Sequence, residues 1–234
     1  MLAGITFAVM LQTALKIDDV KLGTGAVVKA YDVIEVQYIG TLATTGKEFD
    51  SSVKKDKPFR FQVGVGRVIK GWEQGLVGMK VGGERNLTIP PDLGYGDRAR
   101  GELIPANSTL KFNIKLIRIL PAAKIEIITP GTGDALKPGE MLECKLSVKL
   151  PSGKELADPT QVSQLQFNPD MIPGLNQAIA GIKTGEKRKV VIGYELAFGE
   201  TGRPVVDNGE KKAGSDIPPK ADITVVIEAI KISV

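Results

Sequence analysis

Apolar and polar residues alternate along several short stretches of the chain. Residues 34–38 and 112–116 carry an apolar side chain at every second position, and residues 223–229 repeat the pattern with one break at Val226. Successive side chains of a strand point to opposite faces, so this period of two is typical of strands with one buried face. We therefore predict a sheet built from these stretches, with turns between them.

One segment between the predicted strands has helical spacing instead. Within residues 68–76, Trp72 and Leu76 lie one helical turn apart, and Ile69 precedes them on the same face. Three glycines in or just after this segment weaken an isolated helix, because each interior Gly costs about 1 kcal/mol relative to Ala. The helix should therefore form only when it packs on the sheet. Many strands and one short helix predict an α+β domain on an antiparallel sheet.

The chain contains the same pattern twice, with four short blocks recurring in the same order. The pairs are Gly23-Thr24-Gly25 with Gly131-Thr132-Gly133, Gly46-Lys47-Glu48-Phe49 with Gly153-Lys154-Glu155-Leu156, Gly78-Met79-Lys80-Val81-Gly82 with Gly181-Ile182-Lys183-Thr184-Gly185, and Leu93-Gly94-Tyr95-Gly96 with Leu196-Ala197-Phe198-Gly199. A break at Pro121-Ala122-Ala123 separates the two units. We predict an N-terminal segment 1–16, a first domain 17–120 and a second, related domain 121–234.

Composition excludes several kinds of chemistry. The chain has no histidine, which excludes Ser-His-Asp and Cys-His nucleophiles and any histidine-ligated metal site. Its 31 Lys and Arg residues are scattered among 27 Asp and Glu residues, so no basic run predicts nucleic-acid binding. The single Cys144 lies in an alternating stretch and is interpreted as a buried structural residue.

The N-terminal segment has two interpretations that the sequence leaves open. Residues 2–11 are apolar apart from Gly4 and Thr6, which is too short for a membrane span but long enough for the core of a signal peptide. No Lys or Arg precedes this core, so a plain N-terminal extension is equally compatible. If residues 1–14 are a signal peptide, the protein enters the secretory pathway or is exported; otherwise it is cytoplasmic.

Several motifs of the first unit, taken together and in order, resemble one family. They are Tyr38 with Gly40, the run Gly46-Lys-Glu-Phe-Asp-Ser-Ser52, Pro58-Phe59, Gly66-Arg-Val-Ile-Lys-Gly-Trp72, Gly94-Tyr95-Gly96 and Ile104-Pro105. Over about residues 23–120 the chain resembles the FKBP family, the macrolide-binding peptidyl-prolyl cis-trans isomerases. The resemblance implies two tandem FKBP-like domains, each a twisted antiparallel sheet half-wrapped around one short helix.

The resemblance also implies a site. An apolar cleft between helix and sheet should accept a prolyl side chain and be lined by Tyr38, Phe49, Asp50, Phe59, Val68, Ile69, Trp72, Tyr95, Leu103, Ile104 and Phe112. Trp72 is expected as its floor. The backbone N–H of Ile69 and the hydroxyl of Tyr95 are expected to reach the carbonyls that flank the proline, with Asp50 at the rim. Lys55 stands where many relatives carry an Arg, so it keeps the charge without the bidentate geometry.

This residue set fits rotation about an amide bond without a catalytic acid or base. Rotation about an X-Pro bond crosses a barrier of about 20 kcal/mol because it breaks amide resonance, and unaided it takes tens of seconds or more. The twisted amide has less charge separation than the planar one, so a dry aromatic pocket favours the twisted form. The expected partners are proline-containing polypeptides and macrolide inhibitors such as rapamycin, with no cofactor, metal or stable membrane span.

The second unit departs from this pattern at the cleft positions. Tyr38 is replaced by Leu146, Phe49 by Leu156, Asp50 by Ala157, Trp72 by Leu175 and Tyr95 by Phe198. We predict that this unit keeps the fold and lacks activity. The same alignment predicts a shortened segment between Phe167 and Met171, compared with Phe59 to Val68, and a longer polar loop at 200–215.

Three functions remain open at this stage. The first is an isomerase that assists protein folding and carries a degenerate second domain. The second is a chaperone or partner-binding module without important turnover, and the third is a regulatory protein that sequesters macrolides or partners. An isomerase needs Tyr95 and Trp72 in a closed, dry pocket, whereas a holding chaperone needs only an exposed apolar patch.

Overall fold

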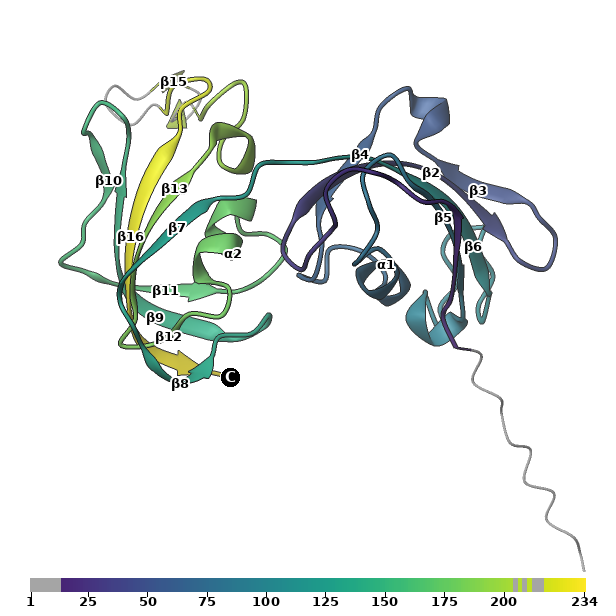
Figure 1. Ribbon diagram of the computed structural model, residues 1–234, viewed down its shortest axis with the longest axis horizontal. Coiled ribbons are helices and arrows are strands. Elements are labelled where there is room, and N and C mark those ends of the chain that lie inside the picture. Colours follow the sequence, from purple (N-terminus) through teal and green to yellow (C-terminus); the bar gives the residue numbers. More distant parts are fainter. Residues whose placement is uncertain (1–13, 204–205, 208–209, 212–216) are drawn as a thin grey trace, which may run out of the picture.

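The computed structural model describes residues 14–203, 206–207, 210–211 and 217–234 (Figure 1). The predicted signal peptide or extension therefore falls almost wholly outside the described residues, and much of the predicted loop 200–215 does too. Within the described part of the chain, neither helix has the length and apolar character needed to cross a bilayer.

The first unit is a six-stranded antiparallel sheet in the order β1-β5-β6-β2-β3, with β4 paired to the other end of β2. Its strands are β1 (Lys16–Lys21), β2 (Val33–Leu42), β3 (Glu48–Ser51), β4 (Phe59–Gln62), β5 (Glu84–Ile89) and β6 (Leu110–Ile119), with 3-10 turns η1 (Val53–Lys55) and η2 (Pro91–Leu93). The two predicted strands lie in β2 and β6, and every second side chain is buried there as predicted.

The predicted helix is confirmed as α1 (Lys70–Gly75), with Ile69 at its N-cap and Leu76 at its C-cap. Its glycines have a packing role. A Cβ on Gly71 would lie 2.5 Å from a methyl carbon of Ile89, and one on Gly75 would lie 2.8 Å from Leu87. The helix therefore lies so close to β5 that only hydrogen fits at these two positions.

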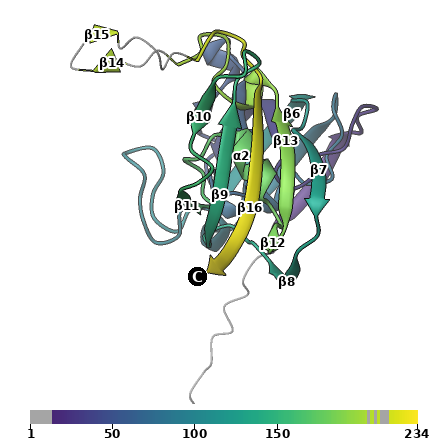
Figure 2. The same ribbon diagram turned by 90° about the vertical axis from the view of Figure 1, so that its left-hand side faces the viewer.

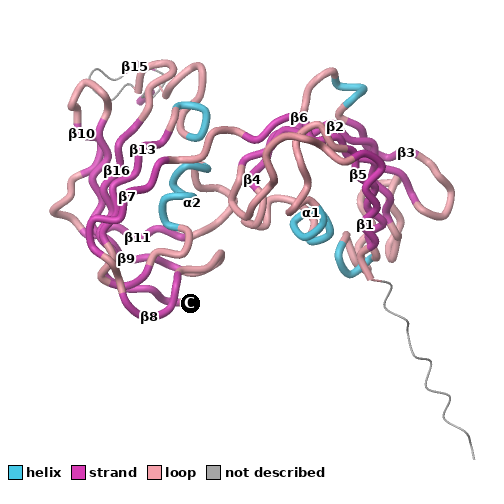
Figure 3. The backbone as a smooth tube through the Cα atoms, viewed as in Figure 1, coloured by secondary structure: helices cyan, strands magenta, loops and turns pink. Residues whose placement is uncertain are grey.

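The second unit repeats this topology in the order β10-β9-β16-β13-β7, with β11 paired to β9 (Figure 2). Its main elements are β7 (Lys124–Thr129), β9 (Met141–Lys149), β10 (Glu155–Ala157), β11 (Val162–Gln166), α2 (Pro173–Ile179), β13 (Lys187–Ile192), η3 (Tyr194–Leu196) and β16 (Ile223–Ser233). Two small ladders add β8 (Thr132–Ala135) with β12 (Lys183–Thr184), and β14 (Val206–Asp207) with β15 (Glu210–Lys211). Figure 3 shows α1 against the sheet of the first unit and α2 against that of the second, which confirms the α+β fold class of two tandem domains.

One part of the predicted alignment is wrong. The backbone N–H of Phe167 donates to the Glu140 carbonyl at 3.0 Å, as the N–H of Val63 donates to Asp32 at 2.9 Å. Phe167 is therefore the counterpart of Val63, and the position of Phe59 falls on Ser163. The segment before Met171 is therefore nearly as long as its counterpart. Aligning Phe167 with Phe59 places the register four positions off, which makes this segment look shortened.

Each helix is tied to its sheet by one buried arginine. Nη1 of Arg85 donates to the carbonyl of Gly75 at 2.8 Å, while its Nε and Nη2 contact the carboxylate of Asp19. Nη1 of Arg188 donates to the carbonyls of Ala178 and Ala180, each at 2.9 Å. Both arginines satisfy carbonyls at the C-terminal end of a helix, where intrahelical donors run out.

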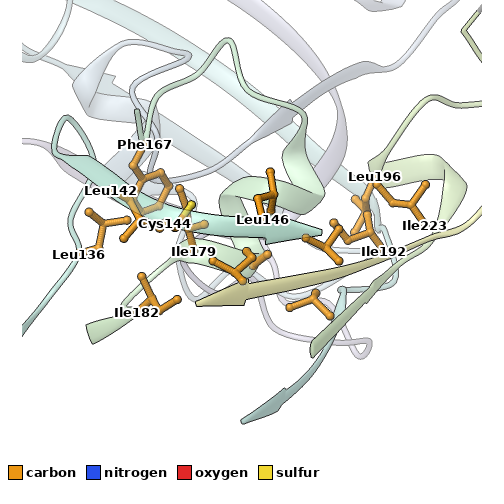
Figure 4. Packing of buried hydrophobic residues seen from close by; sticks show 14 of the residues in the cluster. Leu136, Leu142, Cys144, Leu146, Phe167, Ile179, Ile182, Ile192, Leu196 and Ile223 are labelled. Atoms are coloured by element: carbon orange, nitrogen blue, oxygen red, sulfur yellow. The ribbon is translucent and has the colours of Figure 1, made fainter. Parts of the chain in front are cut away.

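Cys144 lies inside the core of the second unit, as predicted (Figure 4). Its neighbours in that core include Leu142, Leu146, Phe167 and Ile179. Burial raises the pKa of the thiol to about 11, so the reactive thiolate is scarce at neutral pH.

The two units share a contact surface with a polar centre. Nδ2 of Asn176 donates to Oε1 of Gln62 at 2.9 Å, and Nε2 of Gln62 donates to the carbonyls of Tyr31 and Pro173. Gln177 also reaches the Tyr31 carbonyl at 2.9 Å. Around these amides, Val33, Val65 and Leu120 of the first unit belong to the apolar core of the second. The amide network is buried, so each unit helps to satisfy polar groups of the other.

Candidate functional site

A cleft of about 710 Å³ opens between α1 and the sheet of the first unit. Nine of the predicted site residues line it together: Tyr38, Phe49, Asp50, Phe59, Val68, Ile69, Trp72, Tyr95 and Phe112. Gly94 and four cationic residues, Lys55, Arg67, Arg98 and Arg100, complete the wall. Strand, helix and loop residues that are far apart in the sequence thus meet at one concave surface.

Two predicted residues do not line this cleft. Leu103 is 43% exposed on a turn, and Ile104 is only 7% exposed, in the core. The reason is a two-way backbone bridge: the N–H of Arg100 donates to the Ile104 carbonyl at 2.8 Å, and the N–H of Ile104 donates back at 3.3 Å. This bridge turns Leu103 outward and Ile104 inward.

Trp72 forms the centre of the aromatic wall and is 4% exposed. Its ring centroid lies 5.1 Å from those of both Tyr38 and Phe112, with an interplanar angle of 86° in each case. The edge-to-face arrangement is the favoured geometry for aromatic pairs. Its indole N–H makes no hydrogen bond to any residue that the structure describes. The cleft therefore has a broad apolar floor, and the indole nitrogen is buried within it.

Because Gly40 has no Cβ, the rings of Phe49 and Phe112 can pack against its backbone. A Cβ at this position would lie 2.8 Å from the rings of both Phe112 and Phe49. The equivalent residue in the second unit is Val148, which pairs with Val225 as Gly40 pairs with Phe112. The second unit has room for that side chain because it has no aromatic ring at either neighbouring position.

Asp50 organises the polar edge of the cleft. The Tyr38 hydroxyl donates to one carboxylate oxygen, and the other accepts from Lys55 Nζ at 2.7 Å and from the Ser51 N–H at 2.9 Å. Burial raises the pKa of Asp50, but the hydrogen bonds from Lys55 and Tyr38 outweigh it and hold that pKa below its ordinary value. Burial, and then the hydrogen bond to Asp50, raise the pKa of Tyr38. Asp50 is therefore ionised and Tyr38 neutral at neutral pH.

Glu73 holds the loop that enters α1, and sequence reasoning missed it. Its carboxylate accepts the N–H of Gly64 and, at 3.3 Å, that of Val68. Ile69 follows at the helix N-cap, with its carbonyl accepting from Trp72 at 2.9 Å. No described residue accepts a hydrogen bond from the Ile69 N–H, which leaves that donor for a bound molecule. An acidic residue in the first turn of a predicted helix was the available signal.

The counterpart surface of the second unit is aliphatic. Leu146 is buried, and Leu156, Leu175 and Phe198 are half-buried against the core. Ala157 at the position of Asp50 has no carboxylate, and Phe198 at the position of Tyr95 has no hydroxyl. This surface therefore has neither the aromatic floor nor the polar edge.

Comparison with protein families identifies both units. The family model for FKBP-type peptidyl-prolyl cis-trans isomerases matches residues 25–117 and 133–230. These two regions include most of the chain and most strands of the two sheets, while the edge strands β1 and β7 lie outside them.

Individual relatives match part of the chain. FK506-binding protein 4 of Chaetomium thermophilum is 62% identical over 103 residues, which is 44% of this chain and 21% of the relative. FK506-binding protein 2 of Dictyostelium discoideum is 53% identical over 91 residues, which is 39% of this chain and 68% of the relative. The solved structure described as the crystal structure of AtFKBP13 is 42% identical, with a TM-score of 0.43, and the match covers 45% of this chain and 93% of that one. The chain thus matches about a fifth of the length of FK506-binding protein 4 of Chaetomium thermophilum.

Proposed function

We propose that this chain, which belongs to the FKBP-type peptidyl-prolyl cis-trans isomerase family, accelerates rotation about X-Pro bonds in protein substrates. The observation that supports this most directly is the Trp72-floored cleft, with Tyr38 and Phe112 packed edge-on against the indole. The relatives are named for binding FK506. We therefore also propose that macrolides such as FK506 and rapamycin compete for this cleft.

The proposed mechanism is stabilisation of the twisted amide. A prolyl ring packs on Trp72, and the apolar walls remove water from the amide carbonyl. That carbonyl loses hydrogen bonds that the planar, charge-separated amide needs more than the twisted one does. Preferential binding of the twisted form lowers the barrier, because only interactions stronger in the transition state than in the ground state raise the rate.

Polar groups at the edge hold the substrate in register. The free N–H of Ile69 and the hydroxyl of Tyr95 bind backbone carbonyls of the substrate that flank the rotating amide. Asp50 accepts from Tyr38 and so fixes the ring that borders the proline. No proton is transferred in this scheme, and the ionised Asp50 and neutral Tyr38 keep their charge states throughout.

We propose domain boundaries of 17–120 and 121–234, with activity confined to the first domain. The loss of Trp72, Tyr38 and Asp50 counterparts supports an inactive second domain. Its shared apolar core and amide contacts with the first domain support a stabilising role. The biological role that follows is assistance to protein folding, since unaided proline isomerisation is slow enough to limit folding.

The test is isomerisation of a Leu-Pro peptide by the full chain, with and without rapamycin. The proposal predicts acceleration over the uncatalysed rate and its loss when rapamycin saturates the cleft. Binding of rapamycin without acceleration on several peptides would instead favour a partner-binding module.

A further inference from the structure

The proposed active cleft is bordered by an excess of positive charge. Four cationic side chains line it, Lys55, Arg67, Arg98 and Arg100, against a single carboxylate, Asp50. They come from three separate segments of the sequence, so no run of basic residues predicts this cluster. We propose that the cleft selects proline-containing segments with anionic side chains, carboxylate or phosphate, next to the X-Pro bond. This inference rests on the proposed function and adds the substrate class.

The ion pairs around the cleft show which cationic side chains are available to bind an anionic ligand. Lys55 neutralises Asp50, since their charged atoms lie 2.7 Å apart. Arg67 lies 3.4 Å from Asp170 of the second unit, and the two side chains are 55% and 86% exposed. Ion pairs this exposed contribute little and exchange readily with other partners. Arg98 and Arg100 form no ion pair with any residue that the structure describes. An incoming anion thus meets at least two uncompensated guanidinium groups.

Arg100 is held in place before any substrate arrives. Its backbone is fixed by the two-way bridge to Ile104, and its guanidinium carbon lies 5.0 Å from the ring centroid of Tyr95. A cation over an aromatic face is attracted by the ring quadrupole, which restricts the otherwise flexible side chain. Tyr95 is also a proposed substrate-binding residue. The charge on Arg100 is therefore fixed beside the position where the substrate backbone should lie.

The cations should act mainly on substrate capture. They are exposed, so each direct pair with an anion should be weak, but together they attract anionic segments over a longer range. Such attraction changes the association rate and KM more than kcat. It also weakens with salt, because the Debye length falls from about 10 Å at 0.1 M to about 3 Å at 1 M.

The experiment uses the full chain and four peptides that share a central Leu-Pro pair. The residues on either side of this pair are Glu, phosphoserine, Gln or Lys, so the rotating bond itself stays the same. At low salt we expect kcat/KM for the Glu peptide to be about fivefold above that of the Gln peptide, and that of the Lys peptide about fivefold below it, as expected for ion-pair energies up to about 1 kcal/mol. The differences should lie mainly in KM and shrink below about twofold in 1 M salt. A higher value for phosphoserine than for Glu would assign the preference to phosphate, and the reverse order would assign it to carboxylate.

Two variants locate the effect. The double variant Arg98→Gln and Arg100→Gln should reduce the ratio between the Glu and Gln peptides to less than about twofold. Lys115→Gln removes a charge from the solvent-facing side of β6, where Lys115 is exposed between buried Ile114 and Leu116, and should leave that ratio unchanged. Both variants alter exposed side chains, so circular dichroism should show the wild-type fold.

The outcomes separate this inference from the function on which it rests. Equal rates for the Glu and Lys peptides at low salt would overturn the inference and leave the isomerase function intact. Failure to accelerate any of the four peptides would overturn the proposed function itself. A preference that persists in the double variant would contradict the assignment to Arg98 and Arg100.

Discussion

The ring of Tyr38 meets the indole of Trp72 edge-on, with ring centroids 5.1 Å apart and planes at 86°. The same two backbone positions in the second unit carry Leu146 and Leu175. The two domains therefore share a fold while only one has an aromatic cleft. We propose that the isomerase activity depends on that difference, and each consequence of this can be measured.

Gly40 provides a steric test of the aromatic wall. Gly40→Val introduces the residue found at the equivalent Val148 and places its Cβ about 2.8 Å from the rings of Phe49 and Phe112. Because those rings must move, we expect a loss of about 1–3 kcal/mol in the free energy of unfolding and at least a tenfold fall in kcat/KM. Urea denaturation and a Leu-Pro peptide assay measure both. The control Val148→Ala should leave kcat/KM unchanged, and an active Gly40→Val protein would contradict the assignment of the wall.

The hydroxyl of Tyr38 should matter less than its ring. Tyr38→Phe keeps the contact with Trp72 and removes one hydrogen bond to Asp50, whose carboxylate keeps its contact with Lys55. We expect a loss of about 1 kcal/mol in the free energy of unfolding and a fall of less than tenfold in kcat/KM. NMR titration should show that the pKa of Asp50 rises toward its ordinary value. A loss of activity as large as that caused by removing Trp72 would assign the hydroxyl a direct part in catalysis.

Activity should depend little on pH near neutrality. The pKa of Asp50 is held below its ordinary value and that of Tyr38 is raised, so neither group titrates between about pH 5.5 and 9. We expect a flat profile of kcat/KM for an uncharged peptide over this range at constant ionic strength. A bell-shaped profile inside the range would indicate general acid-base catalysis, which the proposed mechanism excludes.

Asp50 stabilises the folded state at neutral pH and should lose this effect in acid. Its pKa is lower in the folded state than in the unfolded chain, so it stabilises the fold fully above about pH 4, the ordinary aspartate value. That stabilisation is lost as the pH falls through the folded pKa. Asp50→Asn should therefore flatten the acid limb of the stability curve, measured by urea denaturation from pH 7 to pH 2. An unchanged acid limb in this variant would contradict the ion-pair geometry.

The amide contacts between the domains should couple their unfolding. Asn176→Ala removes the donor to Gln62 and leaves a buried amide oxygen without this partner, which costs about 1–3 kcal/mol. Trp72 is the single tryptophan of the chain, so fluorescence follows the first domain alone while far-ultraviolet circular dichroism follows both. The two thermal transitions should coincide in the wild type and separate in the variant. The control Lys189→Ala changes an exposed side chain of β13 and should leave the transitions together. Coincident transitions in Asn176→Ala would show that the apolar contacts couple the domains without the amides.

Most of the fold could be predicted from local patterns. Alternation located the strands around Val36 and Ile114, and the repeated blocks predicted two related domains. These features depend on short-range spacing, which a single sequence displays directly. The nine residues on the cleft wall were predicted only through the family resemblance, because spacing alone does not distinguish a cleft aromatic residue from a core one.

What the sequence could not predict depends on contacts between distant segments. The outward turn of Leu103 follows from the backbone bridge between Arg100 and Ile104. The equivalence of Phe167 with Val63 is visible only in strand register. The cations around the cleft and the Gln62–Asn176 contact between the domains bring together residues that have no periodic relation in the chain.

The most direct test of the central claim compares two matched substitutions in the full chain. Trp72→Leu converts the cleft floor to the residue found at Leu175, and Leu175→Ala truncates the equivalent position of the second domain. Both should be assayed for isomerisation of the same Leu-Pro peptide, with circular dichroism as the check on folding. The account predicts that Trp72→Leu lowers kcat/KM at least tenfold, because the aromatic floor that favours the twisted amide is lost, and that folded Leu175→Ala keeps the wild-type rate. Wild-type activity in folded Trp72→Leu, or loss of activity in folded Leu175→Ala, would contradict the assignment of catalysis to the first domain.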